Sequence, residues 1–255
     1  MSPGASRQSL RTKLVGERRL VGTWLTLTDP VAAEIARESG LEFAIVDGEH
    51  APLGPETIHL LVGALRGGAV SAVVRVPANE PVYFATALDA GADGVLVPQV
   101  RSADDVARAV RSSRYPPEGA RGWGPRRPSG YGRDAAAYRA VANDNAAVII
   151  QVELKEAVEN LASILRVDGF DAVLVGPNDL AGSLGHPGEI THPEVQDTIR
   201  SIIDSCVSGN VPVGIACGGE PAEILRWFEA GCRFVAAAAD YLVLAQGYDR
   251  LAGSI

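Results

Sequence analysis

Short runs of apolar, mostly β-branched residues recur along the chain and alternate with longer amphipathic segments. Eight of these runs have the length and composition of buried strands, at residues 21–26, 43–46, 73–76, 94–97, 148–152, 172–175, 213–215 and 234–237. No hairpin signal joins one run to the next, so neighbouring strands need crossover connections. The alternation therefore predicts an α/β protein with a parallel sheet.

The segments between the runs have the apolar spacing of helices, at residues 30–39, 55–66, 81–90, 103–112, 154–165, 193–208 and 220–229. Three helix-to-strand junctions repeat one pattern (SGLEF, AGADG and AGCRF), in which Gly40, Gly91 and Gly231 can end a helix in the left-handed conformation. Eight strand–helix units predict a closed (β/α)8 TIM barrel. The alternative is an open doubly wound sheet, but no GxGxxG follows the first strand to support it.

The whole chain, residues 1–255, is expected to form a single domain, because barrels of this size remain undivided. The polar residues 1–14 are expected to be flexible, and residues 240–255 to form a closing helix that packs on the barrel or on a neighbouring subunit. The Gly-, Pro- and Arg-rich segment 115–145 interrupts the alternation of strands and helices, and one helix is predicted within it around 134–142. Long irregular segments are often functional, which directs attention to the loop at 119–133.

Charge and cysteine content restrict the possible partners and compartment. A net charge of −8 and a pI near 5.1 disfavour nucleic acid as a partner. Cys206, Cys217 and Cys232 lack CxxC spacing and are expected to be reduced thiols. No signal peptide or long apolar run is found, so the prediction is a soluble cytoplasmic protein without a membrane partner.

A parallel barrel carries its reactive groups where its strands end. The second predicted strand leads into the segment DGEH (residues 47–50), the third ends at Arg75, the fourth at Pro98 and Gln99, the fifth carries Gln151 and Glu153, and the sixth leads into residues 176–179. Two of these groups, Glu153 and Asp179, are carboxylates from adjacent strands, which suits a hard divalent ion. The alternative is that each carboxylate stabilises the start of the helix that follows.

His50 is the predicted general base, since it alone among the four histidines follows directly from a strand end. Asp89 is the candidate to orient it. Arg75 needs an anionic partner, either a carboxylate or enolate substrate, or Asp47 or Glu49 beside it. In GPNDLAGSLG, a helix start faces the barrel mouth and offers backbone amides to a carboxylate.

The strings GTWLTLTDP, VDGEHAPLG, VVRVP, ALDAGADGVLVPQV, RYPPEGARG, QVELKEAVEN and GPNDLAGSLG resemble, in order and spacing, the HpcH/HpaI aldolase family of metal-dependent pyruvate aldolases. The resemblance implies a hexameric trimer of swapped dimers and a divalent cation (Mg, Mn or Co) held by Glu153 and Asp179. It also implies that Arg75 contacts the ketone or enolate oxygen, and that His50 does acid/base work with Asp89 as its partner. The implied substrate-binding residues are Trp24, Trp123, Gln151, Gly176, Pro177, Asn178, Asp179 and Ala216.

The activity implied by the resemblance is reversible cleavage of a 4-hydroxy-2-oxo acid to pyruvate and an aldehyde. Trp123, Ala216 and Cys217 depart from residues common in the family, which leaves the aldehyde open. Three alternatives share the scaffold: a decarboxylating or bond-forming synthase acting on oxaloacetate, a lyase of CoA thioesters, and a non-catalytic barrel that binds a 2-oxo acid.

Overall fold

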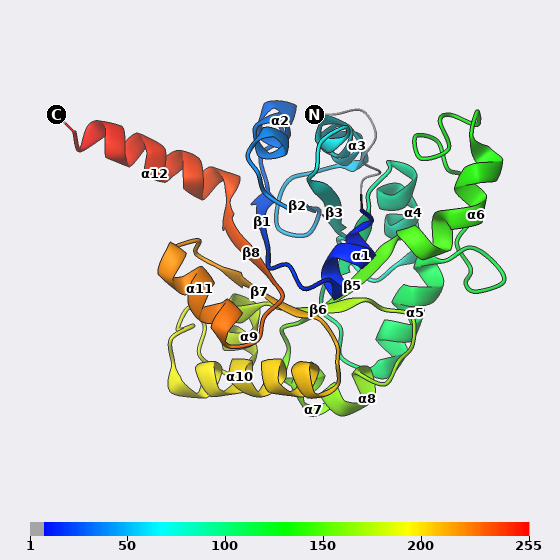
Figure 1. Ribbon diagram of the computed structural model, residues 1–255. Coiled ribbons are helices and arrows are strands. Elements are labelled where there is room, and N and C mark those ends of the chain that lie inside the picture. The colour runs from blue at the N-terminus through cyan, green and yellow to red at the C-terminus, as the bar shows by residue number, and fades with distance from the viewer. Residues whose placement is uncertain (1–7, 255) are drawn as a thin grey trace.

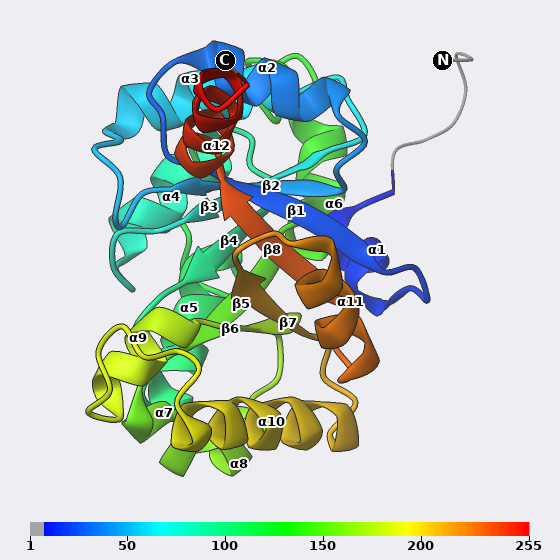
Figure 2. The same ribbon diagram turned by 90° about the vertical axis from the view of Figure 1, so that its left-hand side faces the viewer.

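The computed structural model describes residues 8–254, and its eight parallel strands close into a barrel in sequence order (Figures 1 and 2). β1 pairs in parallel with both β2 and β8, so the sheet has no edge. The predicted (β/α)8 barrel is confirmed, and the open doubly wound alternative is wrong. The strands are β1 Leu20–Leu25, β2 Phe43–Asp47, β3 Ser71–Arg75, β4 Gly94–Val97, β5 Ala147–Val152, β6 Ala172–Val175, β7 Val213–Cys217 and β8 Phe234–Ala239.

Helices connect the strands around the outside of the barrel (Figure 2). Several begin with proline, whose missing N–H is not needed in the first turn. The three predicted junction glycines, Gly40, Gly91 and Gly231, all have positive φ. The helices are α2 Pro30–Glu38, α3 Pro55–Leu65, α4 Pro81–Asp89, α5 Ala103–Ser113, α6 Ala135–Asn145, α7 Lys155–Glu159, α8 Leu161–Ile164, α9 Pro177–Ser183, α10 Pro193–Ser208 and α11 Pro221–Glu229.

The single helix predicted over 154–165 is wrong, because α7 and α8 replace it. Asn160 interrupts the helix with φ −96° and ψ 5°, and its side-chain amide donates to the carbonyl of Arg101 at 2.9 Å. This bond ties the break between α7 and α8 to the segment that follows β4.

Side chains on the inner face of the strands fill the barrel and supply the polar groups at its carboxyl end. Ile45, Val73, Ile149 and Leu174 belong to one buried apolar cluster inside the barrel. Because alternate residues of a strand share a face, the residues two positions further on, Asp47, Arg75, Gln151 and Gly176, follow on the same inner face. The barrel thus supports the polar groups at its carboxyl end on an apolar layer.

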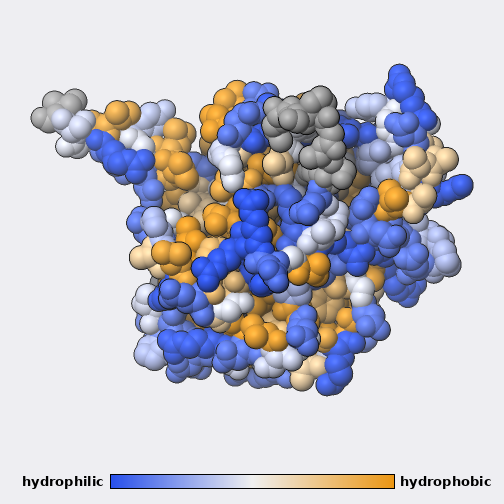
Figure 3. Space-filling model, viewed as in Figure 1, coloured by the Kyte–Doolittle hydropathy of each residue, from blue (hydrophilic) through white to orange (hydrophobic). Residues whose placement is uncertain are grey.

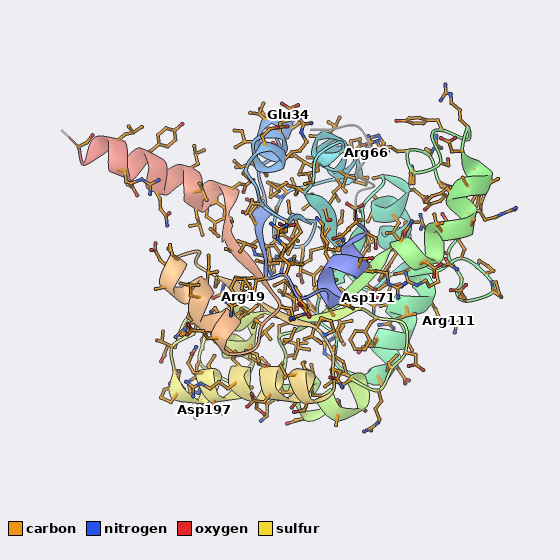
Figure 4. All side chains as sticks on the ribbon, viewed as in Figure 1. Arg19, Glu34, Arg66, Arg111, Asp171 and Asp197 are labelled. Atoms are coloured by element: carbon orange, nitrogen blue, oxygen red, sulfur yellow. The ribbon has the colours of Figure 1, made fainter. Side chains whose placement is uncertain are left out.

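The opposite end of the barrel is closed by α1 (Leu10–Val15), where a flexible segment is expected. Leu10 and Leu14 are each 1% exposed and join the inner apolar cluster. Arg11 donates to Asp171, which is labelled in Figure 4, at 2.5 Å. The expectation of flexibility is therefore wrong for residues 10–14, and residues 1–7 lie outside the described part of the chain.

The helix α12 (Asp240–Ala252) projects away from the barrel and buries none of its residues against it (Figure 1). Its start is anchored, because the Asp240 carboxylate accepts from the amides of Thr26 and Leu27, each at 3.0 Å. Beyond that point apolar side chains are exposed along it, including Val243 and Leu244 (Figure 3). In the part of the chain that the structure describes, no helix has the length and apolar character to cross a membrane.

The long segment 115–145 packs on the outer helices. Its predicted helix is confirmed as α6. Arg127 donates to the carbonyls of His59 at 2.8 Å and Ala90 at 2.9 Å, which ties the segment to α3 and to the end of α4. Within the segment, the ring of Trp123 lies 4.9 Å from that of Tyr115 and 6.1 Å from that of Tyr138.

The buried face of α1 predicts a stability effect. We expect Leu14→Ala to lower the free energy of unfolding by about 2 to 5 kcal/mol, because it leaves a cavity among well-packed side chains. Val15→Ala, at a neighbouring position that is 69% exposed, is the control and should change it little. Urea denaturation measures the free energy of unfolding of both variants, and equal effects would contradict the conclusion that α1 closes this end of the barrel through its buried face.

Candidate active site

A cavity of about 660 Å³ opens where the strands end. Its walls come from the strand ends, the loop before α10, and the helices α9, α11 and α12. Most of the predicted site residues line it: Trp24, His50, Arg75, Gln151, Gly176, Pro177, Asn178, Asp179 and Ala216. Sequence positions far apart in the chain therefore meet at one surface, as the barrel topology predicts.

Asp47 and Arg75 form the central ion pair of this surface. They are register partners on β2 and β3, which places their side chains next to each other. Arg75 Nε and Nη2 donate to the two carboxylate oxygens of Asp47 at 2.8 and 2.6 Å, and the Trp24 ring centroid lies 4.5 Å from the guanidinium carbon. Burial alone would raise the pKa of Asp47, but its bonds with Arg75 and the backbone hold that pKa below its usual value. Arg75 therefore has the carboxylate partners that the sequence offered as one alternative, and its contact with a substrate oxygen stays a prediction.

Asp47 also fixes the turn that follows its strand. Its Oδ1 accepts from the amides of Glu49 at 3.1 Å and His50 at 3.2 Å. Glu49 Oε2 lies 3.2 Å from Arg75 Nη1. One buried arginine is therefore shared by two carboxylates, and the turn holds His50 at the cavity mouth.

Glu153 is the most buried carboxylate of the site, at 1% exposure. Its Oε1 accepts from the amide of Gln99 at 2.7 Å, and its Oε2 accepts from the side-chain amide of Gln151. Burial, together with the negative charges of Glu49 and Asp179, raises the pKa of Glu153 to about 7. The negative charges of these three carboxylates thus repel one another, and the positive charge of Arg75 only partly compensates them.

The donor set fits a divalent cation. Gln151 Oε1 is buried and accepts no hydrogen bond, and Glu49 Oε2 is buried with only its ion pair to Arg75 at 3.2 Å, although both are strong acceptors. Gly176 leaves space beside them, since a Cβ there would lie 2.8 Å from both Gln151 Nε2 and Glu153 Oε2. All these donors are oxygens, which Mg²⁺ and Mn²⁺ prefer. Glu153 and Asp179 are the residues that would hold such an ion, with water or substrate oxygens completing its coordination.

His50 is the predicted base, and its side chain is 56% exposed. Its Nε2 lies 3.9 Å from Glu49 Oε2 and 3.9 Å from Asp179 Oδ2. The predicted partner Asp89 instead accepts from Arg121 Nη2 at 2.5 Å, on the segment 115–145. Within residues 8–254 Asp89 thus pairs with a buried arginine of the long segment and not with His50, so its partnership with His50 stays a prediction.

Trp123, expected at the aldehyde end, is not among the residues that line the cavity. It packs against Tyr115 and Tyr138 because its own segment lies on the outer helices. Ala216 does line the cavity, beside Cys217, whose pKa burial raises to about 11. The outer wall also contains Arg226 of α11, for which no salt bridge is found among residues 8–254.

Sequence reasoning assigned no role to Gln99 or Arg226. Gln99 has φ 55° and bridges two carboxylates, with its amide on Glu153 and its side chain 3.0 Å from Glu49 Oε1. Its place at a strand end was visible in the sequence, but its backbone conformation was not. Arg226 gave no signal, since it lies within an amphipathic helix like many solvated arginines.

Comparisons with known proteins agree with this geometry. Residues 20–218 match the family model described as HpcH/HpaI aldolase/citrate lyase. The chain is 36% identical over 252 residues to the 5-keto-4-deoxy-D-glucarate aldolase of Citrobacter koseri, covering 99% of this chain and 98% of that one. It is similar to the crystal structure of a family protein from Burkholderia cenocepacia J2315, with TM-score 0.92, 35% identity and coverage of 96% and 98%. It also resembles an HpcH/HpaI aldolase from Desulfitobacterium hafniense, with TM-score 0.88, 31% identity and coverage of 96% of each chain.

The close contacts that a side chain at Gly176 would make predict that a substitution there weakens ion binding selectively. We expect Gly176→Ala to weaken Mn²⁺ binding by about tenfold or more, because the new methyl group displaces Glu153 and Gln151. Gly182→Ala, on the same helix with nothing within 4 Å of the added carbon, is the matched control. Isothermal titration with Mn²⁺ measures both affinities, and an unchanged affinity for the Gly176 variant would argue against this position of the ion.

Proposed function

The chain belongs to the HpcH/HpaI aldolase/citrate lyase family and is a pyruvate aldolase, a carbon–carbon lyase; we propose that it cleaves a 2-keto-3-deoxy sugar diacid to pyruvate and an aldehyde that carries a carboxylate. Family aldolases of this kind are metal-dependent. The ion itself is proposed to be Mg²⁺, Mn²⁺ or Co²⁺, since its ligands are oxygens.

The observation that carries the proposal is the group of charged side chains at the strand ends: His50, Arg75 and Asp179 line the cavity, and the buried Glu153, whose pKa is raised to about 7, accepts from Gln151 of the cavity wall. Such a perturbed carboxylate beside a bound arginine is typical of a catalytic site. A divalent cation bound by Glu153 and Asp179 supplies Lewis-acid polarisation of a 2-oxo group.

Arg75 stabilises the oxygen that gains negative charge as the enolate of pyruvate forms. Asp47 holds its guanidinium through two hydrogen bonds, so the group is positioned before the substrate arrives. Gln151, Gly176 before α9, and the first two residues of that helix, Pro177 and Asn178, line the cavity and are proposed to orient the pyruvate half. The backbone amides of Asn178 and Asp179 would receive its carboxylate.

His50 is proposed to carry the proton of the hydroxyl group whose carbon leaves as the aldehyde. Its half-exposed ring at the cavity mouth can exchange protons with solvent, and its Nε2 lies 3.9 Å from a carboxylate oxygen of Glu49 and of Asp179.

The reaction is tested by two assays on the purified protein. We expect the wild-type chain with Mn²⁺ to exchange the C3 protons of pyruvate with deuterium and to cleave 5-keto-4-deoxy-D-glucarate. Glu153→Gln should lower both rates by at least about a hundredfold while the fold is retained, because one of the two carboxylate ligands is neutralised. Binding of pyruvate without exchange by the wild type would favour the non-catalytic binding barrel. Exchange without cleavage would favour a different acceptor.

Arg226 is proposed to recognise the distal carboxylate of the acceptor. It lines the outer part of the cavity near Ala216 and Cys217, away from the buried carboxylates, and forms no salt bridge with the described residues. Its guanidinium carbon lies 4.5 Å from the centroid of the Trp227 ring, which leaves the donors of the group available for a carboxylate of the substrate.

Substitution of Arg226 should therefore discriminate between aldehydes. We expect Arg226→Met to raise KM about tenfold for an aldehyde with a carboxylate, through loss of one charge-assisted bond. A neutral aldehyde of similar length is the control and should show an unchanged KM, as should deuterium exchange into pyruvate. Steady-state kinetics of aldol addition gives these values, and equal losses for both aldehydes would assign Arg226 a structural role.

The exposed helix α12 is proposed to pack on a second copy of the chain. Val243, Leu244 and Leu251 are 54%, 47% and 67% exposed, which is unfavourable for an isolated subunit. Tyr241 and Leu242 at its base line the cavity, so contact between subunits would reach the site. The hexameric trimer of dimers remains a prediction.

A further inference from the structure

A second group of metal-ligating side chains lies outside the site just described, in the connection between α9 and α10. His186 follows α9, His192 immediately precedes α10, and Glu194 lies in the first turn of α10. One ligand atom from each residue lies within 4.8 Å of the other two. We name this group the His–His–Glu cluster.

The backbone of the connection brings the two imidazoles together. The amide of Glu189 donates to the carbonyl of His186 at 3.0 Å, and the amide of His192 donates to the carbonyl of Glu189 at 2.9 Å. These turns stack the two rings with centroids 3.6 Å apart and planes inclined by 18°. The ligands are therefore held near one another by main-chain bonds that do not involve their side chains.

The side-chain hydrogen bonds within the cluster leave one ring nitrogen without a partner. His186 Nε2 lies 2.9 Å from Glu194 Oε2, so this pair is satisfied. His192 Nδ1 is buried and has no hydrogen-bond partner in the structure. A buried ring nitrogen without a partner is costly, and coordination of a metal ion is one way to satisfy it.

We propose that the His–His–Glu cluster binds a borderline transition-metal ion such as Zn²⁺, distinct from the ion of the active site. Two imidazole nitrogens and one carboxylate are a donor set of zinc sites, with water as a fourth ligand. The oxygen donors around Glu153 favour Mg²⁺ or Mn²⁺ instead. Metal ions bind in the plane of the imidazole, so binding of a shared ion requires the two nearly parallel rings to turn out of their stack.

The position of the cluster gives the ion a structural role. Ile190 and Thr191, between the two histidines, line the large cavity. Gln196 of α10 also lines the cavity, and its side chain donates to the carbonyl of Ile190 at 2.8 Å. An ion on the two histidines and Glu194 would join both ends of this loop to α10 and hold the cavity wall in place.

The proposal is tested with Co²⁺ as a spectroscopic substitute for Zn²⁺. The protein is the Glu153→Gln variant in excess Mg²⁺, which removes the contribution of the oxygen-donor site. We expect one equivalent of Co²⁺ to bind with the intense visible absorption of a four- or five-coordinate ion with nitrogen ligands. Zn²⁺ should displace it, Mg²⁺ should not, and Zn²⁺ should raise the melting temperature of the same protein.

Further substitutions in this background locate the ion. His192→Gln should weaken Co²⁺ binding by about a hundredfold or more, beyond the loss that follows removal of an outer-shell partner. His186→Gln should do the same and replaces the first variant if that one fails to fold. Glu189→Gln removes an exposed carboxylate of the same loop that is outside the cluster, and should leave binding unchanged. Undiminished binding in both folded histidine variants, or the weak spectrum of an octahedral oxygen site, would overturn the proposal. All these readouts are independent of the proposed reaction.

Discussion

Parallel pairing of β8 with β1 is the constraint on which the rest of this structure depends. Once the sheet is closed, all eight strands end at the same rim, and the connecting helices cover the outside. Alternation along each strand then assigns apolar residues such as Ile45 and Val73 to the interior, and Asp47 and Arg75 to the rim above them. The site side chains at the ends of β1 to β7 meet because the strands form one closed barrel, and no single local motif brings them together.

The rim concentrates negative charge that the protein itself does not fully compensate. Arg75 is engaged by Asp47 and Glu49, so little positive charge remains for Glu153 and Asp179. Burial first, and then the charges of Glu49 and Asp179, raise the pKa of Glu153 to about 7, above the value of an exposed glutamate. A raised carboxyl pKa means that the folded chain binds this proton more tightly than the unfolded chain. Its stabilising contribution is present at acidic pH and is lost as the pH rises through about 7. A bound divalent cation would offset that loss, which couples stability to the ion that the chemistry requires.

The sequence predicts the fold well because the fold depends on periodicity, and periodicity is local. All eight strands lie within a few residues of their expected positions, and Gly40, Gly91 and Gly231 end their helices as expected. The errors concern contacts between distant segments. The docking of α1 rests on two leucines, too few for a pattern, and the partner of Asp89 comes from the irregular segment 115–145. Neither the bridging amide of Gln99 nor the packing of Trp123 away from the cavity could follow from spacing alone.

The two halves of the cavity are built from different kinds of structure, and this difference has a functional consequence. The part of the cavity proposed to bind pyruvate rests on strand ends, where Arg75 and Gln151 lie in paired strands and close packing leaves no room for a Cβ at Gly176. The part proposed to bind the acceptor consists of the loop before α10 and of α11 and α12, where residues such as Arg226 and Tyr241 are exposed. Substitutions in that half cost little stability, because exposed positions have few packed neighbours. Acceptor preference can therefore change through residues such as Ala216 and Arg226 while the buried carboxylates and Arg75 are kept. A structural ion on His186 and His192 would stabilise this exposed part of the cavity wall, because the loop that it joins to α10 carries Ile190 and Thr191.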